Sequence, residues 1–174
     1  MNENHLNTKK GRDFQNFVRN IFEAYFNAPF DLEVSFPIGT PPKPHRFDCA
    51  SQDKKIVIEC KSHSWTAGGN VPSAKMTTIN EAAFYMSFLP HDIRRIIVLK
   101  KSTMTKRNET LAEYYRRING HLLNQIEVFE VDDSGNIRMV KGQASRIFLK
   151  KAEQPATKQL IAKVTNMEVR CNDG

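Results

Sequence analysis

The chain has few cysteines, no long apolar run and none of the glycine-rich patterns that cradle nucleotide phosphates. Its three cysteines, Cys49, Cys60 and Cys171, have no CxxC or Cys/His spacing, which argues against a disulfide framework and a structural zinc site. No stretch reaches the roughly 18 apolar residues of a membrane span, and residues 1–10 lack the apolar core of a signal peptide. We therefore expect a cytoplasmic protein with reduced thiols and no membrane partner.

Acidic residues are outnumbered by basic ones. The 26 lysines and arginines against 19 aspartates and glutamates give a formal net charge of +7. The cations gather in two stretches, the first containing Arg94, Arg95, Lys100, Lys101, Lys106, Arg107, Arg116 and Arg117, and the second Arg138, Lys141, Arg146, Lys150 and Lys151. This distribution favours a polyanionic partner such as nucleic acid, but solvated faces of a soluble protein are an equal alternative on charge alone.

Apolar spacing and turn residues predict the element order αβββαβαββ. Helices are expected at residues 9–27, 73–88 and 109–123, where apolar side chains recur at helical spacing. Strands are expected at residues 32–36, 46–50, 55–61, 95–100, 126–131 and 137–140, with a loop at residues 37–44. The tail from Gly142 is expected to add a strand at residues 146–149 and a short helix after Pro155.

Mixed hairpins and helices predict an α/β fold with a central mixed sheet flanked by helices, rather than a doubly wound parallel sheet. The length of 174 residues suits a single domain, with a core at about residues 9–131 and a C-terminal extension at residues 132–174 that contributes a β-hairpin. Although Gly68 and Gly69 follow a strand, no GxxxxGK[ST] or GxGxxG pattern surrounds them, so a nucleotide-binding fold is disfavoured.

The residues that can carry chemistry lie on the expected hairpin of residues 46–61. Side chains alternate across a strand, so Glu59 and Lys61 share one face, and Asp48 joins them if the two strands pair. An acid and a lysine at the end of an apolar strand are costly unless they are paired or bind a cation. Carboxylate oxygens suit Mg²⁺, and the backbone carbonyl of Cys60 is a further candidate ligand. The alternative is an Asp48 that only borders a turn and a solvated Glu59–Lys61 charge pair.

These residues resemble the motif of the PD-(D/E)xK nuclease superfamily over residues 9–131. The matching features are a helix that begins Lys10-Gly11-Arg12-Asp13-Phe14-Gln15, the Phe47-Asp48 pair on a strand, Glu59-Cys60-Lys61 ending the next strand, and the helix and buried strand that follow. The resemblance implies a restriction-endonuclease-like αβββαβ core, Mg²⁺ bound by Asp48 and Glu59 with Mn²⁺ as a substitute, and Lys61 beside the attacking water.

The function implied is that of a metal-dependent DNA endonuclease of the restriction or the repair and recombination type. Two alternatives stay open, a non-catalytic DNA-binding module on the same fold and an RNA-directed nuclease. The chain departs from the superfamily pattern at Phe47, where proline is common, and at Gln15, where many relatives have a glutamate. Either Gln15 holds a metal-bound water or Glu23, two turns later, reaches the site instead.

Seven further residues are candidates for DNA contact: His45, Arg46, His63, Trp65, Lys75, Arg116 and Arg117. The alternatives are exposed polar residues at strand ends for the first three, packing of Trp65 over the sheet edge, and a half-buried amphipathic helix for the two arginines. Cys49 and Cys60 are expected to pack as small apolar residues. A duplex cutter of this size would need two active sites, so a homodimer is expected.

Overall fold

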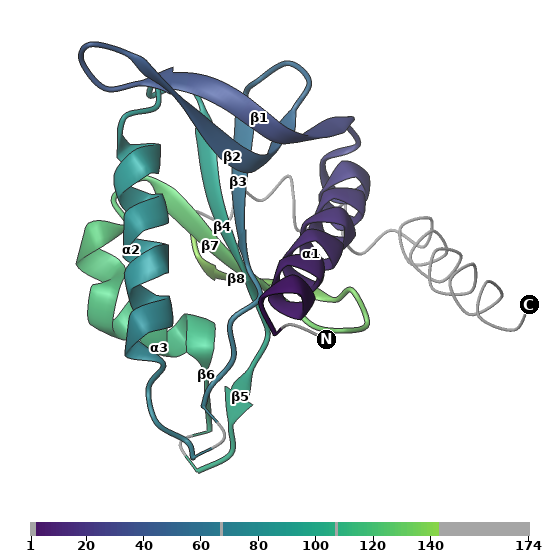
Figure 1. Cartoon of the computed structure of the whole chain (residues 1–174), viewed down its shortest axis with the longest axis vertical. Helices are drawn as coiled ribbons and strands as arrows, with labels where there is room; N and C mark the ends of the chain where they lie inside the picture. Colours follow the sequence, from purple (N-terminus) through teal and green to yellow (C-terminus); the bar gives the residue numbers. More distant parts are fainter. Residues whose placement is uncertain (1–2, 67, 107, 143–174) are drawn as a thin grey trace, which may run out of the picture.

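A six-stranded mixed sheet forms the centre of the computed structural model, which describes residues 3–66, 68–106 and 108–142. The strand order across the sheet is β1 (Phe30–Ile38), β2 (Lys43–Ser51), β3 (Ile56–Lys61), β4 (Arg94–Lys100), β7 (Ile126–Val131) and β8 (Ile137–Lys141). Helix α1 (Glu3–Phe26) covers one face, and α2 (Ser73–Ser87) and α3 (Leu111–Asn119) cover the other (Figure 1). The predicted α/β fold with a central mixed sheet flanked by helices is confirmed.

Strand directions bring the functional residues to one edge of this sheet. Strands β3, β4 and β7 are parallel, whereas β1, β2 and β8 run antiparallel to their neighbours. Each parallel step is crossed by a helix, α2 between β3 and β4 and α3 between β4 and β7. The carboxyl ends of three parallel strands therefore share one edge of the sheet, and Lys61 is the last residue of β3.

Alternating side chains of the strands build two separate cores. On the α1 face, Phe14, Val18 and Phe22 of the helix pack on strand residues that include Cys49, Ile58 and Cys60. On the other face, α2 and α3 pack on strand residues such as Val57, Ile97 and Leu99. Cys49 and Cys60 are buried free thiols within the α1 core, as expected for small packing residues.

The predicted order of elements is confirmed, with differences at four places. Helix α1 begins at Glu3, six residues before its expected start at residue 9. Strands β1 and β2 take up half of the expected loop at residues 37–44, because their ladder continues to the pair Ile38 and Lys43. The last helix begins at Leu111 with a capping box of Thr110 and Glu113, and it gives way to a 3₁₀ turn at Gly120–Leu122. A two-stranded hairpin of β5 (Thr103–Met104) and β6 (Glu109–Thr110) was not predicted.

The C-terminal extension is described only in its first part. Residues 137–141 form β8, which pairs with β7 as the predicted hairpin. The expected strand at residues 146–149 and the helix after Pro155 lie outside the described residues. No helix in the described part of the chain is both long and apolar enough to cross a membrane.

Candidate active site

Asp48 is fixed above the end of β3 by hydrogen bonds from two different elements. The register pairs Cys49 with Ile58, so Asp48 and Glu59 are the next residues along the two strands. Asp48 Oδ2 accepts a hydrogen bond from the backbone N–H of Cys60 at 2.7 Å. Its Oδ1 accepts one from Nε2 of Gln15 on α1 at 2.5 Å. Both carboxylate oxygens are therefore held in place, one by the strand and one by the helix.

Glu59 and Lys61 lie side by side on the opposite face from Ile58 and Cys60, as the alternation predicts. Lys61 Nζ donates to Glu59 Oε2 at 3.1 Å, and the two side chains are 20% and 8% exposed. Burial, the charge of Asp48 and a hydrogen bond with it raise the pKa of Glu59 to about 8, although Lys61 opposes the shift. In the metal-free protein Glu59 therefore holds a proton at neutral pH.

Lys61 remains an ammonium in this setting. Burial alone lowers its pKa, but the charges of Glu59 and Asp48 and the hydrogen bond with Glu59 outweigh burial and raise the pKa above its usual value. The site thus brings together two carboxyl groups and one fixed cation. This arrangement is the one expected from the sequence, and the alternative of a solvated charge pair does not fit side chains that are this buried.

The backbone of Cys60 adds an oxygen to the same place. In an extended strand the N–H and C=O of one residue point to the same side, so the Cys60 carbonyl faces β2 as its N–H does. The pairing of β2 with β3 has ended before this point, at Cys49 and Ile58. The Cys60 carbonyl therefore lies beyond the β2 ladder, on the side where Asp48 sits.

These groups fit a hard divalent cation. Mg²⁺ takes oxygen ligands, one or two of them carboxylates, and keeps several waters. Asp48, Glu59 and the Cys60 carbonyl supply such oxygens, and the proton that burial holds on Glu59 marks a place where positive charge is favoured. Within residues 3–66, 68–106 and 108–142, no group of three or more His, Cys, Asp or Glu side chains is placed to hold a metal ion.

The structure brings Gln15 to the site but not Glu23. Glu23 Oε1 accepts the backbone N–H of Phe30 at 3.0 Å, which fixes the junction between α1 and β1. It lies two turns beyond Gln15, or about 12 Å along the helix at 1.5 Å per residue. Of the two candidates from the first helix, Gln15 is therefore the one positioned to act on the site.

The two histidines beside the site are held by neighbouring side chains. His45 stacks on Tyr85 of α2 with ring centroids 4.0 Å apart, and His63 Nε2 lies 2.8 Å from Thr78 Oγ1. Burial, together with the charges of Lys61 and Lys75, lowers the pKa of His63 to about 4. His63 is therefore neutral at physiological pH, and it offers no charge to a phosphate.

The remaining candidates near the site are more exposed. Arg46 points to solvent with Glu33 3.7 Å away, a separation at which an exposed pair adds little. Lys75 is exposed in the first turn of α2, and its charge reaches His63. Among the described residues neither side chain has a strong partner, so both are available to a polyanion.

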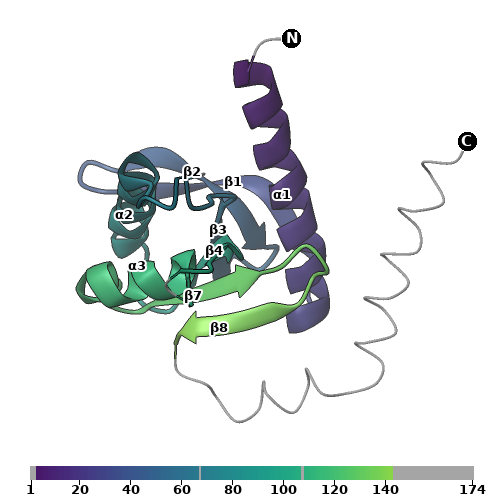
Figure 2. The same cartoon turned by 90° about the horizontal axis from the view of Figure 1, so that it is seen from below.

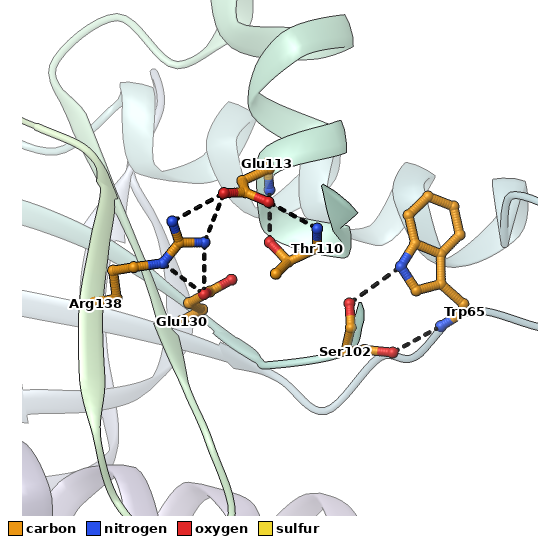
Figure 3. Close-up of polar contacts among 6 residues, drawn as sticks. All are labelled: Trp65, Ser102, Thr110, Glu113, Glu130 and Arg138. Atoms are coloured by element: carbon orange, nitrogen blue, oxygen red, sulfur yellow. Dashed lines mark hydrogen bonds and ion pairs between the residues drawn. The ribbon is translucent and has the colours of Figure 1, made fainter. Parts of the chain in front are cut away.

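Trp65 is anchored rather than free to stack on a base. Its Nε1 donates to the backbone carbonyl of Ser102 at 3.1 Å, and its backbone N–H donates to Ser102 Oγ at 3.2 Å (Figure 3). The indole also makes an edge contact with Tyr114, with ring centroids 5.3 Å apart. These contacts favour the packing interpretation and tie the loop after β3 to the end of β4. Nothing in the local sequence around Trp65 signals Ser102 as its partner.

The fluorescence of Trp65, the only tryptophan, provides a test of this assignment. We expect its emission to stay unquenched when saturating duplex DNA is added, because Ser102 holds the indole N–H and the ring packs against Tyr114. The measurement is an emission titration, with labelled DNA confirming that binding occurs. Strong quenching that tracks binding would show that Trp65 stacks on the nucleic acid.

Many cations of the two basic stretches have ion-pair or hydrogen-bond partners within the protein. Arg94 pairs with Glu127 at 2.7 Å, Lys100 with Asp133 at 2.7 Å, and Arg117 with Glu109 at 2.9 Å. Arg95 and Lys141 donate to backbone carbonyls, and Arg138 binds Glu113 and Glu130. Arg116 and Arg117, both expected as DNA contacts, are exposed, but Arg117 is engaged by Glu109. The basic surface is smaller than the composition suggests.

Arg138 shows how such internal ion pairs stabilise the fold. Its Nε lies 2.7 Å from Oε1 of Glu130, which is 1% exposed, and its Nη1 lies 2.9 Å from Glu113 Oε1 (Figure 3). The second oxygen of Glu130 is buried without a hydrogen-bond partner among the described residues. Among the described residues, the Arg138 guanidinium is therefore the only side chain that offsets the cost of burying the Glu130 carboxylate.

Replacing Arg138 with alanine is expected to lower the free energy of unfolding by about 3 kcal/mol, because it leaves Glu130 buried and unpaired. Urea unfolding measures this change. The matched control is Arg117→Ala, which breaks a more exposed pair and should cost less than about 1 kcal/mol. Equal effects of the two variants would contradict the special role given to the Glu130 pair.

Comparisons of the chain with protein-family models, curated proteins and solved structures find no match. The assignment of a function therefore depends on the geometry of the site itself.

Proposed function

We propose that the protein is a Mg²⁺-dependent DNA endonuclease with a restriction-endonuclease-like fold. The observation that carries the proposal is the convergence of Asp48, Glu59 and Lys61, three groups with the chemistry needed to hydrolyse a phosphodiester. The order α1-β1-β2-β3-α2-β4 supports the fold, since it is the αβββαβ order that the sequence resemblance implies. The placement of Gln15 against Asp48 supports the match in the first helix.

Each residue has a role that follows from its position. Asp48, Glu59 and the Cys60 carbonyl would hold the cation, and Gln15 keeps the Asp48 carboxylate oriented through its amide. When bound, Mg²⁺ or Mn²⁺ polarises the scissile phosphate and lowers the pKa of a water. Lys61 carries a charge that its carboxylate neighbours maintain, so it can orient the attacking water and stabilise negative charge on the phosphate. The water oxygen forms a bond to phosphorus as the bond from phosphorus to the leaving oxygen breaks. The water gives up one proton to solvent and the leaving oxygen takes one up from solvent, so the protons balance.

A substrate panel tests the proposal. The protein is incubated with Mg²⁺ or Mn²⁺ and with linear, supercoiled, branched and single-stranded DNA, and with RNA. We expect cleavage of at least one DNA form with either metal and none in EDTA. Cleavage confined to RNA would establish the RNA-directed alternative. DNA binding without cleavage and without Mg²⁺ binding in a calorimetric titration would establish the non-catalytic module.

A further inference from the structure

The first part of α1 extends beyond the cores that hold the rest of the helix. The helix spans Glu3–Phe26, but Phe14 is the first of its described side chains to be buried. The side chains of Lys9, Lys10 and Arg12 are exposed. Figure 2 shows this end of the helix projecting past the sheet and away from α2 and α3. The hydrophobic core therefore does not explain why the helix continues over these residues.

Gly11 is the residue of this projection that the fold explains least. Glycine within a helix weakens it relative to alanine, so it usually marks a required turn or a close packing contact. Gly11 lies within the helix, and a Cβ added there would meet nothing within 4 Å. Neither its backbone conformation nor its neighbours within the chain require glycine. A close approach by an external group would require it.

The position of Gly11 shows which group could approach. Gly11 lies four residues before Gln15, so the two share one side of the helix. Gln15 Nε2 holds Asp48 Oδ1 at 2.5 Å, which places Gly11 one turn from the candidate active site. In the described part of the chain no acidic side chain forms an ion pair with Lys9, Lys10 or Arg12, in contrast to the paired arginines around α3.

We infer that residues 9–15 form a backbone-binding arm, on which the sugar-phosphate backbone of duplex DNA lies beside the bond to be cut. Gly11 allows that backbone to approach the helix closely, and Lys9, Lys10 and Arg12 contact its phosphates. Charge complementarity selects this occupant, because the three exposed cations at positions 9, 10 and 12 outnumber the one exposed acid of the segment, Asp13. The inference rests on the proposed function and adds the surface that orients the substrate.

The test compares two glycines that are both free of internal contacts. Gly11→Gln introduces a neutral side chain into the arm, and Gly120→Gln does so at the end of α3, where a Cβ also meets nothing within 4 Å. Affinity of the full chain for a short labelled DNA duplex is measured by fluorescence anisotropy in EDTA, which prevents cleavage. We expect Gly11→Gln to weaken binding by about tenfold. Gly120→Gln should bind as the wild type does, and neither variant should lower the melting temperature, since glutamine favours helix over glycine.

A charge variant provides the second measurement. Lys10→Gln combined with Arg12→Gln should reduce the slope of log affinity against log salt by about two, since each lost phosphate contact removes roughly 0.9. Wild-type affinity in Gly11→Gln, equal losses in both glycine variants, or an unchanged slope would overturn the backbone-binding arm and leave the proposed function intact. Failure of the wild type to bind DNA would overturn both.

Discussion

Replacement of Lys61 by methionine should lower the rate of DNA cleavage in Mg²⁺ by about 10²- to 10³-fold, the usual cost of losing one charge-stabilising group at a phosphate or oxyanion. Methionine matches the lysine side chain as far as Cε but removes the ammonium that lies 3.1 Å from Glu59 Oε2. Mg²⁺ binding should persist or strengthen, because a cation next to the two carboxyl groups is gone. The measurements are the initial rate of plasmid nicking and a calorimetric Mg²⁺ titration.

The control for this variant is Lys55→Met, which removes an exposed lysine paired with Asp92 just before the same strand. We expect its cleavage rate to equal that of the wild type. Undiminished cleavage by Lys61→Met would remove Lys61 from the mechanism. Loss of Mg²⁺ binding in parallel with the rate would mean that Lys61 supports the metal site rather than the chemical step.

Replacement of Glu59 by glutamine should abolish cleavage and yet stabilise the metal-free protein. The folded-state pKa of Glu59 is raised to about 8 from an ordinary value of 4.5, with burial as the main cause. Between these two pH values the folded protein binds a proton that the unfolded chain releases, so stability falls as pH rises through this window. At pH 7 the penalty is about 3 kcal/mol, from 1.36 kcal/mol per pH unit, and glutamine removes it.

Urea unfolding in EDTA at several pH values measures this effect. The gain of Glu59→Gln over the wild type should be near zero at pH 4 to 5 and should grow toward pH 8. Excess Mg²⁺ should stabilise the wild type but not the variant, since binding to the folded state raises stability by mass action. Glu33→Gln, at an exposed position, is the control and should show no such gain. If Glu59→Gln were less stable than the wild type in EDTA, the claim that the buried Glu59 carboxyl destabilises the metal-free protein would be wrong.

The core of the site was predictable because it depends on local rules. Alternation along a strand put Glu59 and Lys61 on one face, and the short turn between the two strands predicted that Asp48 would face them across the hairpin. Helical spacing identified α1, and the resemblance singled out Gln15. The choice between Gln15 and Glu23 needed the structure, because it depends on where the helix crosses the sheet.

The surface chemistry was less predictable, since its contacts join distant parts of the chain. Arg94 and Arg138 looked like free cations in the sequence, but their partners Glu127 and Glu130 come from β7, and no local pattern shows that the strands bring them together. The position of the Trp65 indole likewise depends on a hydrogen bond to Ser102, which lies 37 residues away in the sequence. Charge runs therefore overstate a binding surface until the internal ion pairs are known.

The most direct test of a metal-dependent nuclease site is plasmid nicking by wild-type protein and by Asp48→Asn in Mg²⁺. Asparagine retains an oxygen that can accept the Cys60 N–H but loses the charge that holds the cation. Asp92→Asn, at an exposed ion pair, is the control. The account predicts nicking by the wild type and the control, and none by Asp48→Asn or by any of the three in EDTA. Equal nicking by wild type and Asp48→Asn, or nicking that persists in EDTA, would contradict it.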